Sequence, residues 1–91
     1  MIAKKIILNG RVQGVGFREF ARRYASIHRI NGFVRNLTTG ELEIFAQGAD
    51  QELSKFIKEI KRGPMLADIK EISCMDADVQ EMYKTGFVIE F

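Results

Sequence analysis

The segment Gly10–Arg18, which reads GRVQGVGFR, most strongly constrains how this chain can fold. An apolar run comes before it and an amphipathic helical pattern follows it. This arrangement predicts a glycine-spaced loop between a strand and a helix, with Arg18 in the first helical turn. Backbone N–H groups at a helix start lack partners within the helix, the helix dipole adds positive potential, and glycine lets the backbone close on a ligand. The segment therefore predicts an anion site, where Arg18 adds donors suited to phosphate or carboxylate.

Glycine spacing alone leaves a second interpretation of this loop open. Gly10, Gly14 and Gly16 do not have the spacing of the dinucleotide-binding fingerprint, and no lysine and hydroxyl pair follows them as in a P-loop. Short motifs often match by chance. On glycine spacing alone, a plain strand-to-helix turn with a solvated arginine is therefore about as well supported as an anion site.

Hydrophobic periodicity predicts two helices and five strands. The first helix covers 17–29 and ends where Asn31 and Gly32 tolerate positive φ. The second begins at an N-cap, Asp50, and stops at Gly63 and Pro64. The expected strands cover 3–12, 32–37, 41–47, 67–75 and 87–91, with a loop over 76–85.

The order βαββαβ, followed by a terminal strand, predicts an α+β ferredoxin-like sandwich. Right-handed crossovers give a four-stranded antiparallel sheet with both helices on one face and a short extra C-terminal strand. A chain of 91 residues predicts one domain over residues 1–91. The alternation of apolar residues in the first and third strands predicts core positions at Ile6, Leu8, Val12, Leu42, Ile44 and Ala46.

The charge distribution favours a small anionic ligand over a nucleic acid. Residues 1–30 hold seven basic residues and one acidic residue, whereas residues 31–91 hold seven basic and eleven acidic residues. The anion loop lies in the basic third, and nucleic-acid binding usually needs a more extended basic face. No apolar run is long enough for a membrane span or a signal peptide, and the single Cys74 fits a reducing compartment. We therefore expect a cytoplasmic protein with no membrane partner.

Few side chains outside the loop offer catalytic chemistry. His28 lies near a helix end, which favours a surface position over a general base. Cys74 lies in a strand pattern and predicts a core thiol rather than a nucleophile. The acidic residues Asp76, Asp78 and Glu81 lack a metal-ligand spacing and predict a solvated loop.

An anion cradle with no evident nucleophile, metal site or acid–base pair narrows the possible reaction. Phosphoryl transfer depends mainly on positioning and electrostatics. A phosphate monoester also needs its alkoxide leaving group protonated or bound to a metal. An acyl phosphate instead releases a carboxylate, whose acid has a pKa of roughly 4. The residues therefore suit hydrolysis of an acyl phosphate, which needs a held phosphoryl group and an aligned water.

A second segment, Gly32–Gly48, gives the loop a more specific interpretation. The motif VQGVGFR over 12–18 and the motif GFVRN over 32–36, followed by Gly40 and Gly48, together resemble the acylphosphatase family. Two motifs in this order and at this separation are more specific than either alone. The resemblance covers essentially the whole chain. It implies a free-standing acylphosphatase, which hydrolyses acyl phosphates to carboxylate and inorganic phosphate.

The resemblance also implies roles for particular residues. Arg18 would grip the phosphoryl oxygens, and Asn36 would orient the attacking water, which suits a neutral amide that both accepts and donates. Neither a metal nor an organic cofactor is implied. The expected partners are an acyl phosphate substrate and inorganic phosphate as product and competitive inhibitor, with no nucleic acid, for a monomeric protein. The implied phosphate-binding positions are the loop amides of Gln13, Gly14, Val15, Gly16, Phe17 and Arg18.

Two other functions stay open on the sequence. A nucleic-acid-binding module shares the ferredoxin-like plan and exposes aromatic side chains on central strands. Here Glu41 and Glu43 share a strand face with Phe45 and Gln47, and these acids would repel a phosphate backbone. The other function is a module that binds a small anion without turnover, as part of a larger protein such as the hydrogenase-maturation proteins that handle carbamoyl phosphate. Hydrolysis of an acyl phosphate distinguishes an enzyme from both.

Overall fold

The computed structural model describes residues 1–83 and 85–90, and it contains two α-helices, one short 3-10 helix and five strands in that part of the chain. In chain order the elements are β1 (Ile2–Arg11), α1 (Phe17–Ile27), β2 (Asn31–Asn36), β3 (Leu42–Gly48), α2 (Asp50–Arg62), β4 (Asp68–Ala77), η1 (Glu81–Tyr83) and β5 (Phe87–Glu90).

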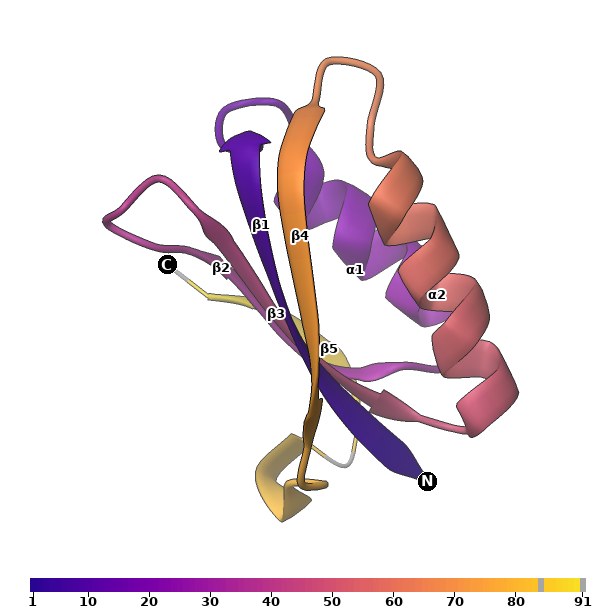
Figure 1. The fold of residues 1–91 in the computed structure, drawn as a ribbon. Helices are drawn as coiled ribbons and strands as arrows, with labels where there is room; N and C mark the ends of the chain where they lie inside the picture. Colours follow the sequence, from indigo (N-terminus) through magenta and orange to yellow (C-terminus); the bar gives the residue numbers. More distant parts are fainter. Residues whose placement is uncertain (84, 91) are drawn as a thin grey trace.

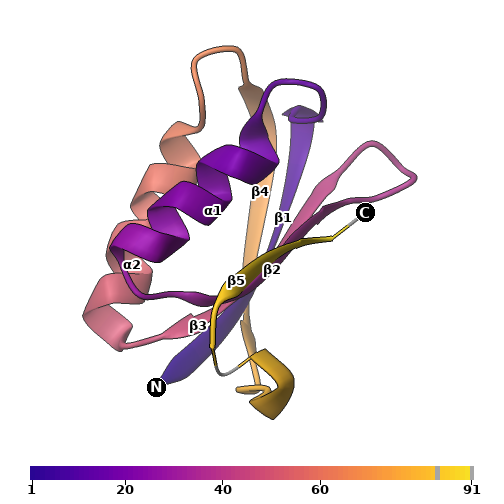
Figure 2. The ribbon, with the colours of Figure 1, turned by 180° about the vertical axis from the view of Figure 1, so that it is seen from behind.

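The strands form one sheet in the order β4-β1-β3-β2-β5. β1 pairs antiparallel with both β3 and β4, and β2 pairs antiparallel with β3. Both helices lie side by side on one face of this sheet (Figures 1 and 2). The expected ferredoxin-like α+β fold is therefore confirmed.

Strand β5 makes the sheet mixed rather than purely antiparallel. It lies beside β2 and runs parallel to it, with Ile89 paired to Val34 (Figure 2). The predicted strand over 87–91 is observed over 87–90, and residue 91 lies outside the described residues. Because side chains alternate along strands, Ile89 shares the helix-covered face with the fully buried Val34.

The main core lies between the sheet and the two helices. All six core positions predicted for the first and third strands are buried. The helices contribute apolar residues at the spacing of a single helical face, which is why each helix buries one side. These helical core residues are Phe17, Phe20, Ala21 and Ala25 of α1 and Leu53, Phe56 and Ile60 of α2.

The chain after β4 covers the central part of the opposite face of the sheet. The side chain of Gln47 is fully buried, and its Nε2 donates to the carbonyl oxygens of Gln80 and Tyr83 at 3.0 Å each. Its Oε1 accepts from the Gln80 N–H at 2.8 Å. The Tyr83 ring packs against Phe33 and Phe45, with centroids 5.3 and 5.7 Å away. Strand β3 is therefore buried on both faces, which the sequence pattern did not predict.

Several predicted boundaries are wrong by one or two residues. Helix α1 ends at Ile27, and Arg29 beyond it takes a positive φ of 55°. Asp50 is the first residue of α2 rather than its N-cap, which is Ala49 with an extended backbone. β4 continues to Ala77 because it stays paired with β1.

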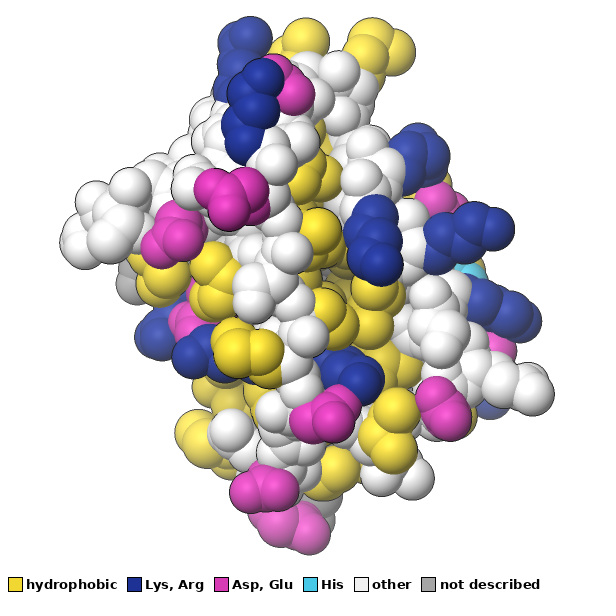
Figure 3. Space-filling view, in the orientation of Figure 1, with side chains coloured by type: hydrophobic (Ala, Val, Ile, Leu, Met, Phe, Trp, Pro, Cys, Tyr) yellow, Lys and Arg dark blue, Asp and Glu magenta, His cyan; other side chains and the backbone are white. Residues whose placement is uncertain are grey.

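Cys74 is exposed, so the prediction of a core thiol is wrong. It pairs with Ile6 and therefore lies on the helix-covered face, as a core residue would. However, β4 is the outer strand of the sheet, and hydrophobic side chains remain visible along the seam between β4 and α2 (Figure 3). Strand alternation selects the face of the sheet, but a helix must also cover that position to bury it.

Candidate active site

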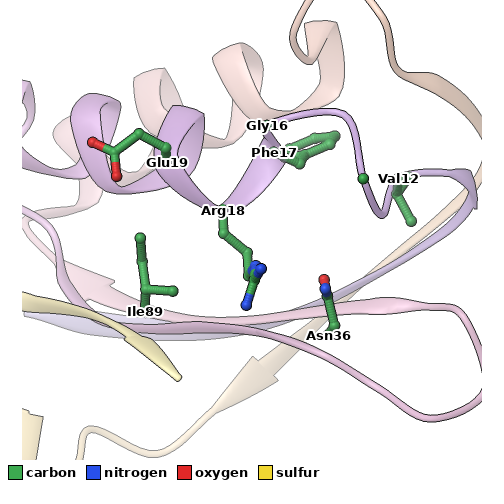
Figure 4. A pocket seen from close by; sticks show the side chains of 8 residues that line it. Val12, Gly16, Phe17, Arg18, Glu19, Asn36 and Ile89 are labelled. Carbon is green, nitrogen blue, oxygen red and sulfur yellow. The ribbon is translucent and has the colours of Figure 1, made fainter. Parts of the chain in front are cut away.

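A cavity of about 210 Å³ lies where the loop between β1 and α1 meets the end of β2 (Figure 4). It brings together two segments that the sequence singled out separately. The cavity is lined by Val12, Gly14, Gly16, Phe17, Arg18, Glu19, Asn36 and Ile89.

Two glycines give the loop its shape. Gly14 and Gly16 have φ values of 72° and 78°, in the left-handed region that disfavours other residues. A Cβ at either position would meet nothing within 4 Å, so the conformation rather than the space requires glycine. Gly16 is the N-cap of α1, and no described side chain caps this helix. The N–H groups of the first turn therefore point out of the helix at the end where Phe17 and Arg18 line the cavity.

The side chain of Gln13 fixes the loop to the β2–β3 hairpin. Its Nε2 donates to the carbonyl oxygens of Leu37 and Glu41, at 2.9 Å each. Leu37 follows Asn36 directly, so these bonds hold the loop close to the end of β2. The hairpin closes itself with a bond from the Leu37 N–H to the Glu41 carbonyl at 2.9 Å.

Arg18 extends from the first turn of α1 into the cavity. Its side chain lies between those of Asn36 and Ile89 (Figure 4). The residue is half-buried, so the sheet and the loop partly shield it from solvent. A guanidinium in this position presents a planar set of donors to an anion that enters the cavity.

Asn36 lies at the end of β2 and faces the same cavity. Its side-chain Oδ1 is buried and has no hydrogen-bond partner among the described residues. Leaving a buried acceptor unsatisfied is unfavourable by about 1–3 kcal/mol, and such groups normally bond to ordered water or a ligand. The amide therefore marks a place where a small polar molecule completes the site.

Most of the predicted loop positions face the cavity. Gln13 does not line it, because its side chain bonds to the hairpin, and the side chain of Val15 packs into the core. The predicted loop positions that do line it are Gly14, Gly16, Phe17 and Arg18.

Comparison with known sequences decides the family. The family model of acylphosphatases matches residues 4–89, which include the loop, Arg18 and Asn36. The chain belongs to the acylphosphatase family.

The relatives named acylphosphatase match over most of their own length, whereas a much longer protein, HypF, matches in one part. An acylphosphatase from Archaeoglobus fulgidus is 42% identical over 80 residues, which cover 88% of this chain and 90% of that protein. The crystal structure of an acylphosphatase from Bacillus subtilis has a TM-score of 0.93 at 34% identity and covers 100% of both chains. A full-length HypF in its phosphate- and nucleotide-bound form has a TM-score of 0.91 at 38% identity. That match covers 99% of this chain but 12% of HypF.

Three residues that line this acylphosphatase-family site were not predicted as site residues, namely Val12, Glu19 and Ile89. Glu19 directly follows Arg18 in the sequence, and this adjacency is the feature that could have identified it as a lining residue. Its carboxylate accepts from Arg22 Nε at 3.1 Å, and this hydrogen bond holds the pKa of Glu19 below its usual range. The carboxylate is turned away from Arg18 in Figure 4. Ile89 reaches the site only through the parallel pairing of β5, which no local pattern reveals.

The other candidate residues lie away from the cavity. His28 is half-buried rather than at the surface, and its Nδ1 lies 3.0 Å from Glu52 Oε1 on α2. Within residues 1–83 and 85–90, no group of three or more histidine, cysteine or acidic side chains could hold a metal ion. No helix of these residues is long and apolar enough to cross a membrane.

Proposed function

We propose that this chain hydrolyses acyl phosphates to a carboxylate and inorganic phosphate by direct attack of water in the cavity between Arg18 and Asn36. One observation carries the proposal, namely the buried and unpartnered Oδ1 of Asn36 in the same cavity as the Arg18 guanidinium. An acceptor for water and a donor for an oxyanion are the two groups that this hydrolysis needs. Membership of the acylphosphatase family supports the same reaction.

In the proposed mechanism the loop and Arg18 hold the phosphoryl group. The backbone N–H groups of the Gln13–Arg18 loop bind its oxygens, and the guanidinium neutralises their charge as the transition state forms. Asn36 Oδ1 accepts a hydrogen bond from a water molecule and aligns the water oxygen with phosphorus. Binding and alignment supply most of the rate because phosphoryl transfer has a loose transition state.

The bond changes need no further catalytic group. The water oxygen forms a bond to phosphorus while the bond between phosphorus and the acyl oxygen breaks. The electron pair leaves with the carboxylate, which is stable without protonation at neutral pH. One water proton stays on the new P–O–H group of inorganic phosphate, and the other passes to a phosphate oxygen or to solvent. We propose that this chain uses neither a metal nor a cofactor and that inorganic phosphate inhibits competitively.

We further propose that residues 1–91 form one domain and that the protein is cytoplasmic and monomeric. The family match over residues 4–89 and the 90% coverage of the Archaeoglobus relative support a single unit. The charges on the outer strand β4 support a monomer, since charged edge strands resist pairing with another chain. These charged side chains are Asp68, Lys70, Glu71 and Asp76.

The nucleic-acid alternative has less support from the geometry. It would need exposed aromatic side chains on the central strands. Phe45 is only 4% exposed, because Tyr83 and Phe33 pack against it. We therefore propose no nucleic-acid partner.

Hydrolysis of benzoyl phosphate by the purified protein in the presence of EDTA tests the proposed function. We expect saturable turnover that inorganic phosphate inhibits competitively. A folded protein that binds phosphate without turnover would instead be an anion-binding module. A salt-dependent shift of single-stranded RNA, without hydrolysis, would favour the nucleic-acid module.

A further inference from the structure

We infer that Ile89 forms the wall against which the acyl group of the substrate lies, so that this enzyme favours acyl phosphates with an apolar acyl group. The inference rests on the proposed function. It concerns the part of the substrate that Arg18, Asn36 and the loop amides do not recognise.

The cavity has two ends with different chemistry. Ile89 pairs with Val34, so it lies one strand outward from Asn36 and two residues back along β2, on the same face of the sheet. Arg18 lies between the two side chains (Figure 4). The loop glycines and the unpartnered amide form the polar end, where the apolar side chains of Val12 and Phe17 are only 1% and 2% exposed. Ile89 belongs to the end beyond Arg18.

The geometry of phosphoryl transfer assigns the acyl group to the Ile89 end. The attacking and leaving oxygens lie roughly in line on opposite sides of phosphorus. If Asn36 orients the water, the leaving carboxylate points away from Asn36. We place the phosphorus beside the Arg18 guanidinium, between Asn36 and Ile89, so the line from the water through phosphorus leads to Ile89 and the acyl group contacts this side chain.

The chemistry of this end favours an apolar group. Ile89 is half-buried and offers neither a donor nor an acceptor to a polar acyl group. Its side chain packs against the core, so a ring placed over it removes apolar surface from water. Among the described lining residues the charged side chains are Arg18 and Glu19, and the Glu19 carboxylate is bonded to Arg22.

Contacts on the opposite face of the sheet hold this wall in place. Glu90, the next residue, accepts a hydrogen bond from the Tyr83 hydroxyl at 3.0 Å. Arg35 of β2 lies 3.9 Å from the same carboxylate. These contacts add to the parallel pairing that holds β5 beside β2, and Ile89 lies within that paired strand.

The test compares kcat/KM for benzoyl phosphate with kcat/KM for acetyl phosphate, which share the reacting group but differ in apolar area. In Ile89→Ala we expect the ratio of benzoyl to acetyl to fall on the order of 10-fold, because a ring loses more contact than a methyl group. Ile89→Val should give a smaller fall in this ratio. Because it retains a branched apolar side chain, it still tests the inference if Ile89→Ala does not fold. The inhibition constant for inorganic phosphate reports separately on the polar end.

Val88→Ala is the matched control. Val88 is the neighbouring apolar residue of β5, 47% exposed on the opposite face, and should leave the ratio at the parent value. An unchanged ratio in both folded Ile89 variants, or an equal loss for both substrates, would overturn the inference while leaving the proposed function intact. A folded parent that hydrolyses neither substrate would refute the proposed function and this inference with it.

Discussion

At the scale of single residues, Arg18 and Asn36 differ in what they offer to the same cavity. Arg18 presents only donors, which suit the oxygens of a phosphoryl group. Asn36 presents a buried acceptor that no described residue satisfies. A phosphoryl oxygen cannot donate to that acceptor once it is ionised, whereas water can. The two side chains should therefore separate substrate binding from water alignment in experiments.

Replacing Arg18 by alanine should abolish turnover and weaken inhibition by phosphate. A charge-assisted hydrogen bond contributes roughly 1.5–3 kcal/mol, so the inhibition constant should rise about 10-fold or more. Steady-state kinetics with benzoyl phosphate and inorganic phosphate measure both effects. Arg23→Ala, on the exposed part of α1, is the control. Near-normal activity in Arg18→Ala would contradict the anion cradle.

Replacing Asn36 by alanine should abolish turnover but keep the inhibition constant of phosphate. The same change removes an unsatisfied buried acceptor, so the free energy of unfolding should stay the same or rise by up to about 1 kcal/mol. Urea denaturation and phosphate inhibition measure the two quantities. Asn9→Ala, at an exposed position of β1, is the control. Loss of phosphate binding together with turnover would assign Asn36 to substrate binding.

At the scale of elements, the site depends on contacts that join segments distant in sequence. The loop after β1 is bonded to the β2–β3 hairpin through Gln13. The two helices are joined by the contact of His28 with Glu52. The first contact holds the loop at the cavity. The second adds to the hydrogen bond from Arg62 Nη2 to the Tyr24 hydroxyl, 2.9 Å long, and to the core packing that hold the helices over the sheet.

Replacing Gln13 by alanine should lower both turnover and stability. The change removes two hydrogen bonds that hold the loop near Asn36, so the free energy of unfolding should fall by about 1–3 kcal/mol. Because the loop then moves relative to the aligned water, we expect kcat to fall more than phosphate affinity. Gln51→Ala, exposed on α2, should change neither quantity. Parent-like kcat in Gln13→Ala would show that the loop holds its position without this anchor.

The contribution of Glu52 to stability should depend on pH. The hydrogen bond with His28 is the main reason that the pKa of Glu52 lies below its usual value of 4.5. The folded state therefore favours the carboxylate, and the stabilisation is complete above that value and lost as the pH falls through the lowered pKa. Thermal unfolding of Glu52→Gln should show a lower Tm than the parent at neutral pH and a vanishing difference in acid. A Tm difference that grows in acid would contradict this linkage. Glu71→Gln, at an exposed position of β4, is the control.

At the scale of the whole molecule, the C-terminal part of the chain completes two different surfaces. The segment from Gln80 to Tyr83 covers the outer face of β3, and β5 supplies one wall of the cavity. Gln47 connects the centre of the sheet to that segment through three hydrogen bonds. The site and the stability of the outer face therefore depend on the same stretch of chain.

Replacing Gln47 by leucine should destabilise the protein strongly. The change breaks three hydrogen bonds and leaves backbone groups of Gln80 and Tyr83 without their partner. The free energy of unfolding should therefore fall by about 2–4 kcal/mol. Urea denaturation measures this loss, and Gln51→Leu at an exposed position is the control. A loss below about 0.5 kcal/mol would show that the segment stays in place without Gln47.

Local patterns in the sequence determined most of the elements and the central part of the site. Helical periodicity identified both helices, and alternation identified the buried residues of β1 and β3. The loop glycines, Arg18 and Asn36 were found from their motifs, and the structure places them around one cavity. The elements and the loop depend on residues close together in the sequence, so local physical preferences predict them, whereas Asn36 was singled out by the resemblance to the acylphosphatase family.

The tertiary structure alone decided the features that depend on distant segments. Parallel pairing of β5 with β2 brings Ile89 to the cavity, and the packing of Tyr83 buries the outer face of β3. The position of β4 at the edge of the sheet leaves Cys74 exposed although it lies on the core face. Alternation reports which face a side chain lies on, but only the assembled sheet and helices determine whether another element covers it.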